Sequence, residues 1–186
     1  MPEDNATALL IIDVQNAIDA PVWGRRGQMS AEANIARLLS HWRERNLPVF
    51  HIRHDSTSAN SPYRPGQAGN AFKAEVAPRA GETVIAKRTN SAFIGTDLEE
   101  RLRQSGISRL VITGVLLENS VGATVRMAGN LGFEVLLPAE AVASTDRTDR
   151  NGKTWPAEDV HALALSILDG EYATVVETQD LLDGPV

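Results

Sequence analysis

The sequence contains no cysteine, and this absence excludes disulfide bonds, thiolate metal sites and a thiol nucleophile in this chain. Basic residues are also few, since 18 Lys and Arg stand against 24 Asp and Glu and give a formal net charge of −6. No basic run occurs anywhere. A surface that binds nucleic acid or an anionic membrane needs clustered Lys and Arg, so we expect neither partner.

Long apolar runs are lacking as well. The longest extends from Ala8 to Ile12, which is far short of the ~20 residues that a membrane helix needs. The first seven residues, MPEDNAT, are acidic and lead directly into a segment typical of a buried strand, so we expect no signal peptide. Together these features predict a cytoplasmic protein.

What the sequence does contain is typical of a soluble globular protein. Its 186 residues are 42% apolar and 23% charged, which suits one domain with a sizeable core. No repeat, low-complexity tract or linker interrupts the chain, so we expect residues 1–186 to form a single domain.

Apolar segments of strand length alternate with segments of helical periodicity. The predicted strands are residues 6–14, 47–53, 82–88, 108–114, 133–138 and 172–178. Thr96 and Glu99 form a capping-box pattern that predicts the start of one intervening helix, and Pro156 suits the first turn of the last one. This alternation predicts right-handed crossovers and an α/β fold whose parallel sheet is covered on both faces.

One connection is unusually long. Residues 54–81, between the second and third predicted strands, are rich in Ser, Pro, Gly and Asn. Loops of this length are often lids or binding loops, although a flexible surface excursion is an equal alternative.

Three polar residues follow the predicted strands. Asp13 ends the first, Lys87 ends the third and Ser120 comes shortly after the fourth. Ligands bind at the carboxyl ends of strands in open α/β sheets, which makes these residues candidates. Taken singly, each has an ordinary explanation, as a turn residue, a solvated lysine or a helix N-cap.

Taken together, they carry a family resemblance. IIDVQN (residues 11–16), AKRTNSAFIGTDLEERLRQSGISRLVITGV (residues 86–115) and GVLLENSVGATVRMAGNLGFEVLLPAEAVAS (residues 114–144) resemble, in order and spacing, three motifs of the isochorismatase-like cysteine hydrolases. The resemblance covers nearly the whole chain. It implies a three-layer fold with a six-stranded parallel sheet in the order 3-2-1-4-5-6, and a homodimer or homotetramer.

The resemblance also implies a mechanism that needs no cofactor. Asp13 would be the acid and base, and Lys87 would keep it ionised. Ser120 occupies the position of the family's nucleophile, and the backbone N–H groups of Leu116 and Ser120 would form the oxyanion hole beside a cis peptide between Val115 and Leu116. Such a site suits hydrolysis of a C–N bond in a small amide, ureide or carbamoyl substrate.

Serine in place of the family's cysteine leaves three explanations open. The chain is a Cys→Ser variant made to trap substrate, or a natural serine member that cleaves a vinyl ether with Asp13 as general acid, or a member that binds a ligand without catalysis or hydrolyses slowly. The preceding turn, Leu116 to Asn119, resembles amidase-type members and favours amide chemistry.

Other residues are candidates for binding substrate. Glu118 could point into the pocket, or it could only satisfy the dipole of the following helix. The remaining candidates for the pocket are Gln15, Trp23, Tyr63, Phe72 and Phe93.

Two histidines raise the question of a metal. Nicotinamidase-like relatives hold a divalent ion through an Asp and two His near the second strand. His51 and His54 lie in this region, but Arg53 and Asp55 do not reproduce that pattern. We therefore predict a core histidine, a surface histidine and no catalytic metal.

Overall fold

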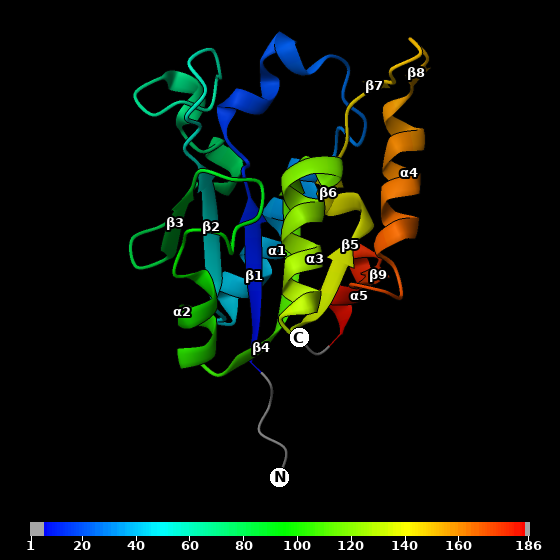
Figure 1. Ribbon diagram of the computed structural model, residues 1–186. Helices are drawn as coiled ribbons and strands as arrows, with labels where there is room; N and C mark the ends of the chain where they lie inside the picture. Colours follow the sequence, from blue (N-terminus) through cyan, green and yellow to red (C-terminus); the bar gives the residue numbers. More distant parts are fainter. Residues whose placement is uncertain (1–5, 185–186) are drawn as a thin grey trace.

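Parallel strands form the middle layer of the computed structural model, which describes residues 6–184 (Figure 1). The order β3-β2-β1-β4-β5-β9 confirms the predicted order, with β9 as the sixth predicted strand, and the short β6 pairs with β4 as an addition. The strands are β1 (Ala6–Ile12), β2 (Val49–His54), β3 (Thr83–Lys87), β4 (Ile107–Val115), β5 (Glu134–Pro138), β6 (Val142–Ala143) and β9 (Thr174–Val176).

Helices cover both faces of the sheet, because alternate residues of its central strands are apolar on both sides. In β1, Leu10 and Ile12 pack on one face with α2 (Leu98–Gln104), α3 (Gly122–Asn130) and the end of α4 (Ala157–Leu168). Leu9 and Ile11 pack on the other face with α1 (Ala31–Glu44) and α5 (Thr178–Asp183). The two cores fix β1 at the centre of the molecule. Among residues 6–184, none of the helices has the length and apolar character needed to cross a membrane.

The sequence prediction placed two boundaries wrongly, the start of a helix and the end of the last strand. Helix α2 begins at Leu98 after Asp97, and the Thr96 hydroxyl donates to the carbonyl of Ala92, so the predicted capping box does not form. The last predicted strand ends at Val176, and α5 begins at Thr178. A hairpin of β7 (Arg147–Thr148) and β8 (Thr154–Trp155) was not predicted, because strands of two residues carry no periodicity.

Residues 54–81 are tied to the sheet by their own polar groups. The Asn70 side-chain amide donates to the carbonyls of His54 and Tyr63 and to the carboxylate of Asp55, at 2.9 to 3.0 Å. The Gln15 amide, just beyond β1, donates in turn to the carbonyl of Asn70 at 2.8 Å. These bonds hold the loop over the carboxyl ends of β1 and β2, as expected of a binding loop rather than a loose excursion.

A second polar cluster joins α1, β2 and the start of β3. The Glu82 carboxylate accepts hydrogen bonds from Nε and Nη2 of Arg43 at 2.6 and 2.8 Å, from the backbone N–H of Arg79 at 2.8 Å and from Nε2 of His51 at 2.8 Å. Burial alone would raise the pKa of Glu82, but these donors hold it at about 2, below the usual 4.5.

The cluster predicts a pH-dependent contribution to stability. Glu82→Gln should lower the free energy of unfolding by about 2 kcal/mol near neutral pH, because a charge-assisted pair is lost. A carboxyl group with a depressed pKa stabilises fully above 4.5 and loses this effect as the pH falls toward about 2. Urea unfolding of the parent chain and the variant across that range measures the difference, which should shrink in acid.

Glu99→Gln is the matched control, because its carboxylate faces Arg103 with about half of each side chain exposed. We expect a change below about 0.5 kcal/mol for this exposed pair. An effect of Glu82→Gln that stays constant with pH would contradict the role of the ion pair.

Candidate active site

The carboxyl ends of β1, β3 and β4 meet at one edge of the sheet. Asp13 follows β1 directly with a φ of 57°, a left-handed conformation that Asp tolerates better than bulky residues do and that turns the chain away from the strand. Lys87 is the last residue of β3, and Val115 is the last of β4. Parallel strands deliver these ends to a common side, where ligands bind in open α/β sheets.

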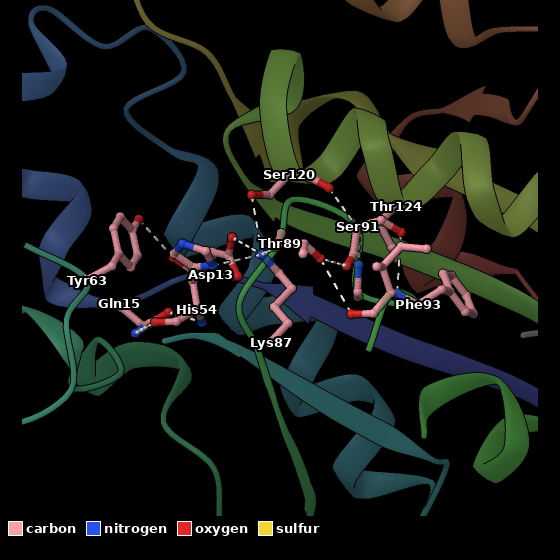
Figure 2. A network of polar contacts seen from close by, with 12 residues as sticks. Asp13, Gln15, His54, Tyr63, Lys87, Thr89, Ser91, Phe93, Ser120 and Thr124 are labelled. Atoms are coloured by element: carbon pink, nitrogen blue, oxygen red, sulfur yellow. Dashed lines mark hydrogen bonds and ion pairs between the residues drawn. The ribbon is translucent and has the colours of Figure 1, made fainter. Parts of the chain in front are cut away.

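A buried ion pair occupies this edge (Figure 2). The ammonium group of Lys87 donates to Oδ2 of Asp13 at 2.7 Å and to the carbonyl of Thr89 at 3.0 Å. It also lies 3.4 Å from the hydroxyl oxygen of Ser120. Asp13 is 3% exposed and Lys87 is 1% exposed, so water screens the pair very little. Lys87 therefore contacts both residues that the sequence marked as base and nucleophile.

Burial raises the pKa of Asp13 above its usual 3.8, because removal from water disfavours the charged carboxylate. The charge of Lys87 opposes this effect, and its hydrogen bond and that of Ser120 add to the opposition. The second carboxylate oxygen, Oδ1, is buried and has no hydrogen-bond partner among the described residues. Burial and the unused Oδ1 position favour the protonated form of this carboxyl group, whereas Lys87 favours the ionised form.

The chain reaches Ser120 through an irregular segment. Gly114 has a φ of 127°, and a Cβ at this position would overlap the backbone of Ile12. The predicted cis peptide between Val115 and Leu116 is present. A π-helical turn over Leu117–Val121 then carries Ser120 into α3, whose N-terminal end favours negative charge.

A pocket of about 380 Å³ opens above these residues. Asp13, Leu116 and Ser120 form part of its lining, together with Trp23 and Tyr63 from the flanking loops. The two aromatic rings meet edge to face with centroids 5.8 Å apart, and the Tyr63 hydroxyl donates to the carbonyl of Asp13 at 3.2 Å. The structure thus brings together these five predicted site residues, with Lys87 buried beside Asp13.

Three other predicted substrate-binding residues do not line the pocket. Gln15 is fully buried, and its side chain is used in hydrogen bonds to the backbone of the 54–81 loop. Phe72 lies edge-on to His51 at 5.9 Å, and Phe93 stacks on Phe133. All three side chains are occupied in packing or in holding the loop, so their placement corrects the prediction.

Glu118 also lies away from the pocket. One carboxylate oxygen accepts from the N–H and hydroxyl of Thr145 and from Nε of Arg147, each at 3.1 Å. Glu118 therefore does not bind in the pocket as predicted. Its hydrogen bonds join the π-helical turn to the segment after β6.

The sequence interpretation missed His54. This residue, predicted to lie on the surface, is half-buried in the pocket lining, with Nδ1 3.4 Å from the Lys87 ammonium group. Burial lowers the pKa of His54, so the ring is neutral near pH 7. The available signal was register, because His54 and Lys87 are paired last residues of neighbouring strands. His51 is fully buried and bonded to Glu82, as a core histidine should be.

No cluster of three or more His, Asp or Glu side chains within residues 6–184 is arranged to hold a metal ion. His51 and His54 have different neighbours, Glu82 for the first and Lys87 for the second.

Known proteins with similar sequences and folds agree in one family. The model of the isochorismatase domain matches residues 7–180. The chain is 40% identical over 176 residues to YrdC, an isochorismatase family protein of Bacillus subtilis (strain 168), and the match covers 95% of this chain and 94% of YrdC. It is 33% identical over 144 residues to the streptothricin hydrolase of Streptomyces noursei, which covers 75% of this chain and 50% of that protein.

A solved structure from the isochorismatase family, from Chromobacterium violaceum ATCC 12472, superimposes with a TM-score of 0.93 at 55% sequence identity. The superposition covers 97% of this chain and 93% of that one. A domain match over most of the sequence, together with this agreement in structure, shows that the chain belongs to the isochorismatase family of hydrolases.

Proposed function

We propose that this hydrolase cleaves a C–N bond of a small amide, ureide or carbamoyl compound without a cofactor, using Asp13, Lys87 and the nucleophile position held by Ser120. One observation carries the proposal: the Lys87 ammonium group lies 2.7 Å from the Asp13 carboxylate and 3.4 Å from the Ser120 hydroxyl. A base, a cation and a nucleophile in mutual reach are the parts that acyl transfer needs. The similarity to streptothricin hydrolase supports hydrolytic chemistry.

In the proposed reaction, the oxygen of Ser120 attacks the substrate carbonyl carbon and passes its proton to Asp13. The backbone N–H groups of Leu116 and Ser120 stabilise the resulting oxyanion. The intermediate then collapses, the C–N bond breaks and Asp13 gives its proton to the departing nitrogen. Water next attacks the acyl-enzyme, and its proton travels through Asp13 to Ser120 as the acid leaves. Lys87 keeps the carboxylate ionised between these transfers.

A serine slows this sequence. A hydroxyl is scarcely ionised near neutral pH, and a carboxylate is a weak base for it, whereas a thiol ionises readily. Ser120, in our proposal, stands where catalytically fast relatives carry cysteine, so this chain is an impaired form of the enzyme.

The alternative function is hydrolysis of a vinyl ether, as in isochorismate-cleaving enzymes, with Asp13 as general acid. Its support is that burial raises the pKa of Asp13, which favours the protonated acid, and that Asp13 forms part of the pocket lining. Ligand binding without catalysis is less well supported, because a buried charge pair is costly to keep in a protein that only binds.

The central test restores a thiol. Ser120→Cys should raise the rate of ammonia release from a panel of small amides, ureas and carbamoyl compounds by about 100-fold or more, since the thiolate forms at neutral pH. Adding Asp13→Asn to this variant should remove the gain, because the proton acceptor is lost.

Ser166→Cys is the matched control, because Ser166 is exposed on α4 and the chain has no other cysteine. This variant should behave like the parent chain. If the Ser120→Cys variant and the parent chain were equally inactive, covalent C–N hydrolysis would be overturned. Vinyl-ether cleavage or ligand binding would then be the better-supported function.

The acid limb of the pH profile should identify the base. For the Ser120→Cys variant, kcat/KM should rise with pH around a midpoint above 3.8, because burial raises the pKa of Asp13 and only its ionised form accepts a proton. His54 also titrates in the pocket, so His54→Gln is the control and should retain the limb. Disappearance of the limb in that control would assign it to the imidazole instead.

A further inference from the structure

The pocket has a polar lining with almost no charge. Among the described residues that form it, no Lys or Arg occurs, and Asp13 is the one carboxylate. An apolar part is made by Ile18, Val22, Trp23 and Leu116, and a hydrogen-bonding part by Ser56, Ser58, Asn60, Asn90 and Asn119. Amides and hydroxyls both donate and accept hydrogen bonds without preferring either sign of charge.

The cation beside the pocket is already neutralised. The side chain of Lys87 is fully buried, is absent from the pocket lining, and is paired with Asp13 at 2.7 Å. The pair has no net charge, so it leaves no positive charge to balance an anionic substrate. His54 adds no positive charge, because its half-buried ring is neutral near pH 7.

A charged group that enters such a pocket loses hydration without gaining a side chain of opposite charge as partner. The penalty is large for a carboxylate or ammonium group that is not paired, whereas a neutral amide is satisfied by ordinary hydrogen bonds. The side-chain amide of Asn90, which lines the pocket, supplies a donor and an acceptor for the amide group of the substrate. The side chains of the loop and of Asn119 supply further donors and acceptors.

We propose that the pocket selects an uncharged substrate, a small neutral carboxamide, ureide or carbamate, and discriminates against analogues that carry a carboxylate. The inference rests on the proposed function in that it concerns the same pocket. It also separates the two candidate reactions, because isochorismate carries two carboxylates. Hydrolysis of a neutral amide produces a carboxylate, which the same lining disfavours and therefore helps to release.

The test compares two compounds of nearly equal shape, succinamide and its monoacid succinamate. For the Ser120→Cys variant near neutral pH, kcat/KM should be about 100-fold higher for succinamide, because the anion is bound without a cation. The cationic 3-aminopropanamide should also be a poor substrate relative to the neutral butanamide. Equal or faster turnover of succinamate would overturn the inference.

A positive charge introduced at the rim of the pocket tests whether the lack of a cation causes the preference for succinamide. Val22 lines the pocket and is 73% exposed, so Val22→Arg should fold normally and should narrow the preference for succinamide by about fivefold. Val22→Gln controls for side-chain length. Met29→Arg controls for net charge, because Met29 is 72% exposed and is not part of the pocket lining. An equal effect of Val22→Arg and Met29→Arg would contradict a local origin.

Binding to the unmodified chain separates this inference from the proposed function. Ligand-observed NMR with a mixture of succinamide, succinamate and chorismate needs no turnover, so it gives an answer even if the Ser120→Cys variant releases no ammonia. Binding signals from succinamide alone would support selection of an uncharged ligand, whichever reaction the protein catalyses. Stronger binding signals from succinamate or chorismate would refute the selection of an uncharged ligand.

Discussion

The ion pair of Asp13 and Lys87 constrains the whole carboxyl edge of the sheet. Removing two charges from water costs several kcal/mol each, and the cost is offset only when the partners meet in good geometry. Here they meet at 2.7 Å although β2 lies between their strands. Neighbouring strands are about 4.8 Å apart, so the long Lys87 side chain bridges about 10 Å past the end of β2. The backbone ladders that set the register of β1, β2 and β3 therefore also bring the two charges within reach of each other.

Ser120 approaches the ion pair from the side of β1 opposite to β2. Strand β4 lies beside β1, and Gly114 allows the two backbones to approach so closely that a side chain has no room. The π-helical turn then places Ser120 over the pair, and Glu118 anchors that turn to Thr145 and Arg147. The proposed base and nucleophile consequently come from the adjacent strands β1 and β4, and Lys87 comes from β3, two strands from β1 on its other side.

The features that depend on local sequence pattern, namely the buried strands and the polar residues at their ends, could be predicted from the sequence. Buried strands are continuous apolar runs, and Asp13 and Lys87 stand out because they are polar at the ends of such runs. Contacts between distant segments could not be predicted in this way. Phe72 and Phe93 were candidates as scarce aromatics beside the predicted site, and Glu118 as a residue of the turn before Ser120. Their partners His51, Phe133 and Thr145 are set by tertiary packing. His54 was missed because the predicted second strand ended at residue 53 and left the histidine in the loop, whereas β2 extends to His54 and pairs it with Lys87 of β3.

Neutrality of the ligand and strength of the base are physically linked. Asp13 is so buried that its pKa already lies above the usual value, and the Lys87 charge is the main influence that keeps it ionised. A second negative charge brought into the pocket would raise the pKa of Asp13 further, because like charges at short range disfavour ionisation. The protonated group could no longer accept the proton of the nucleophile. A substrate that leaves the local charge unchanged therefore satisfies two requirements at once: it avoids an unpaired ion in the pocket, and it preserves the carboxylate on which the proposed reaction depends.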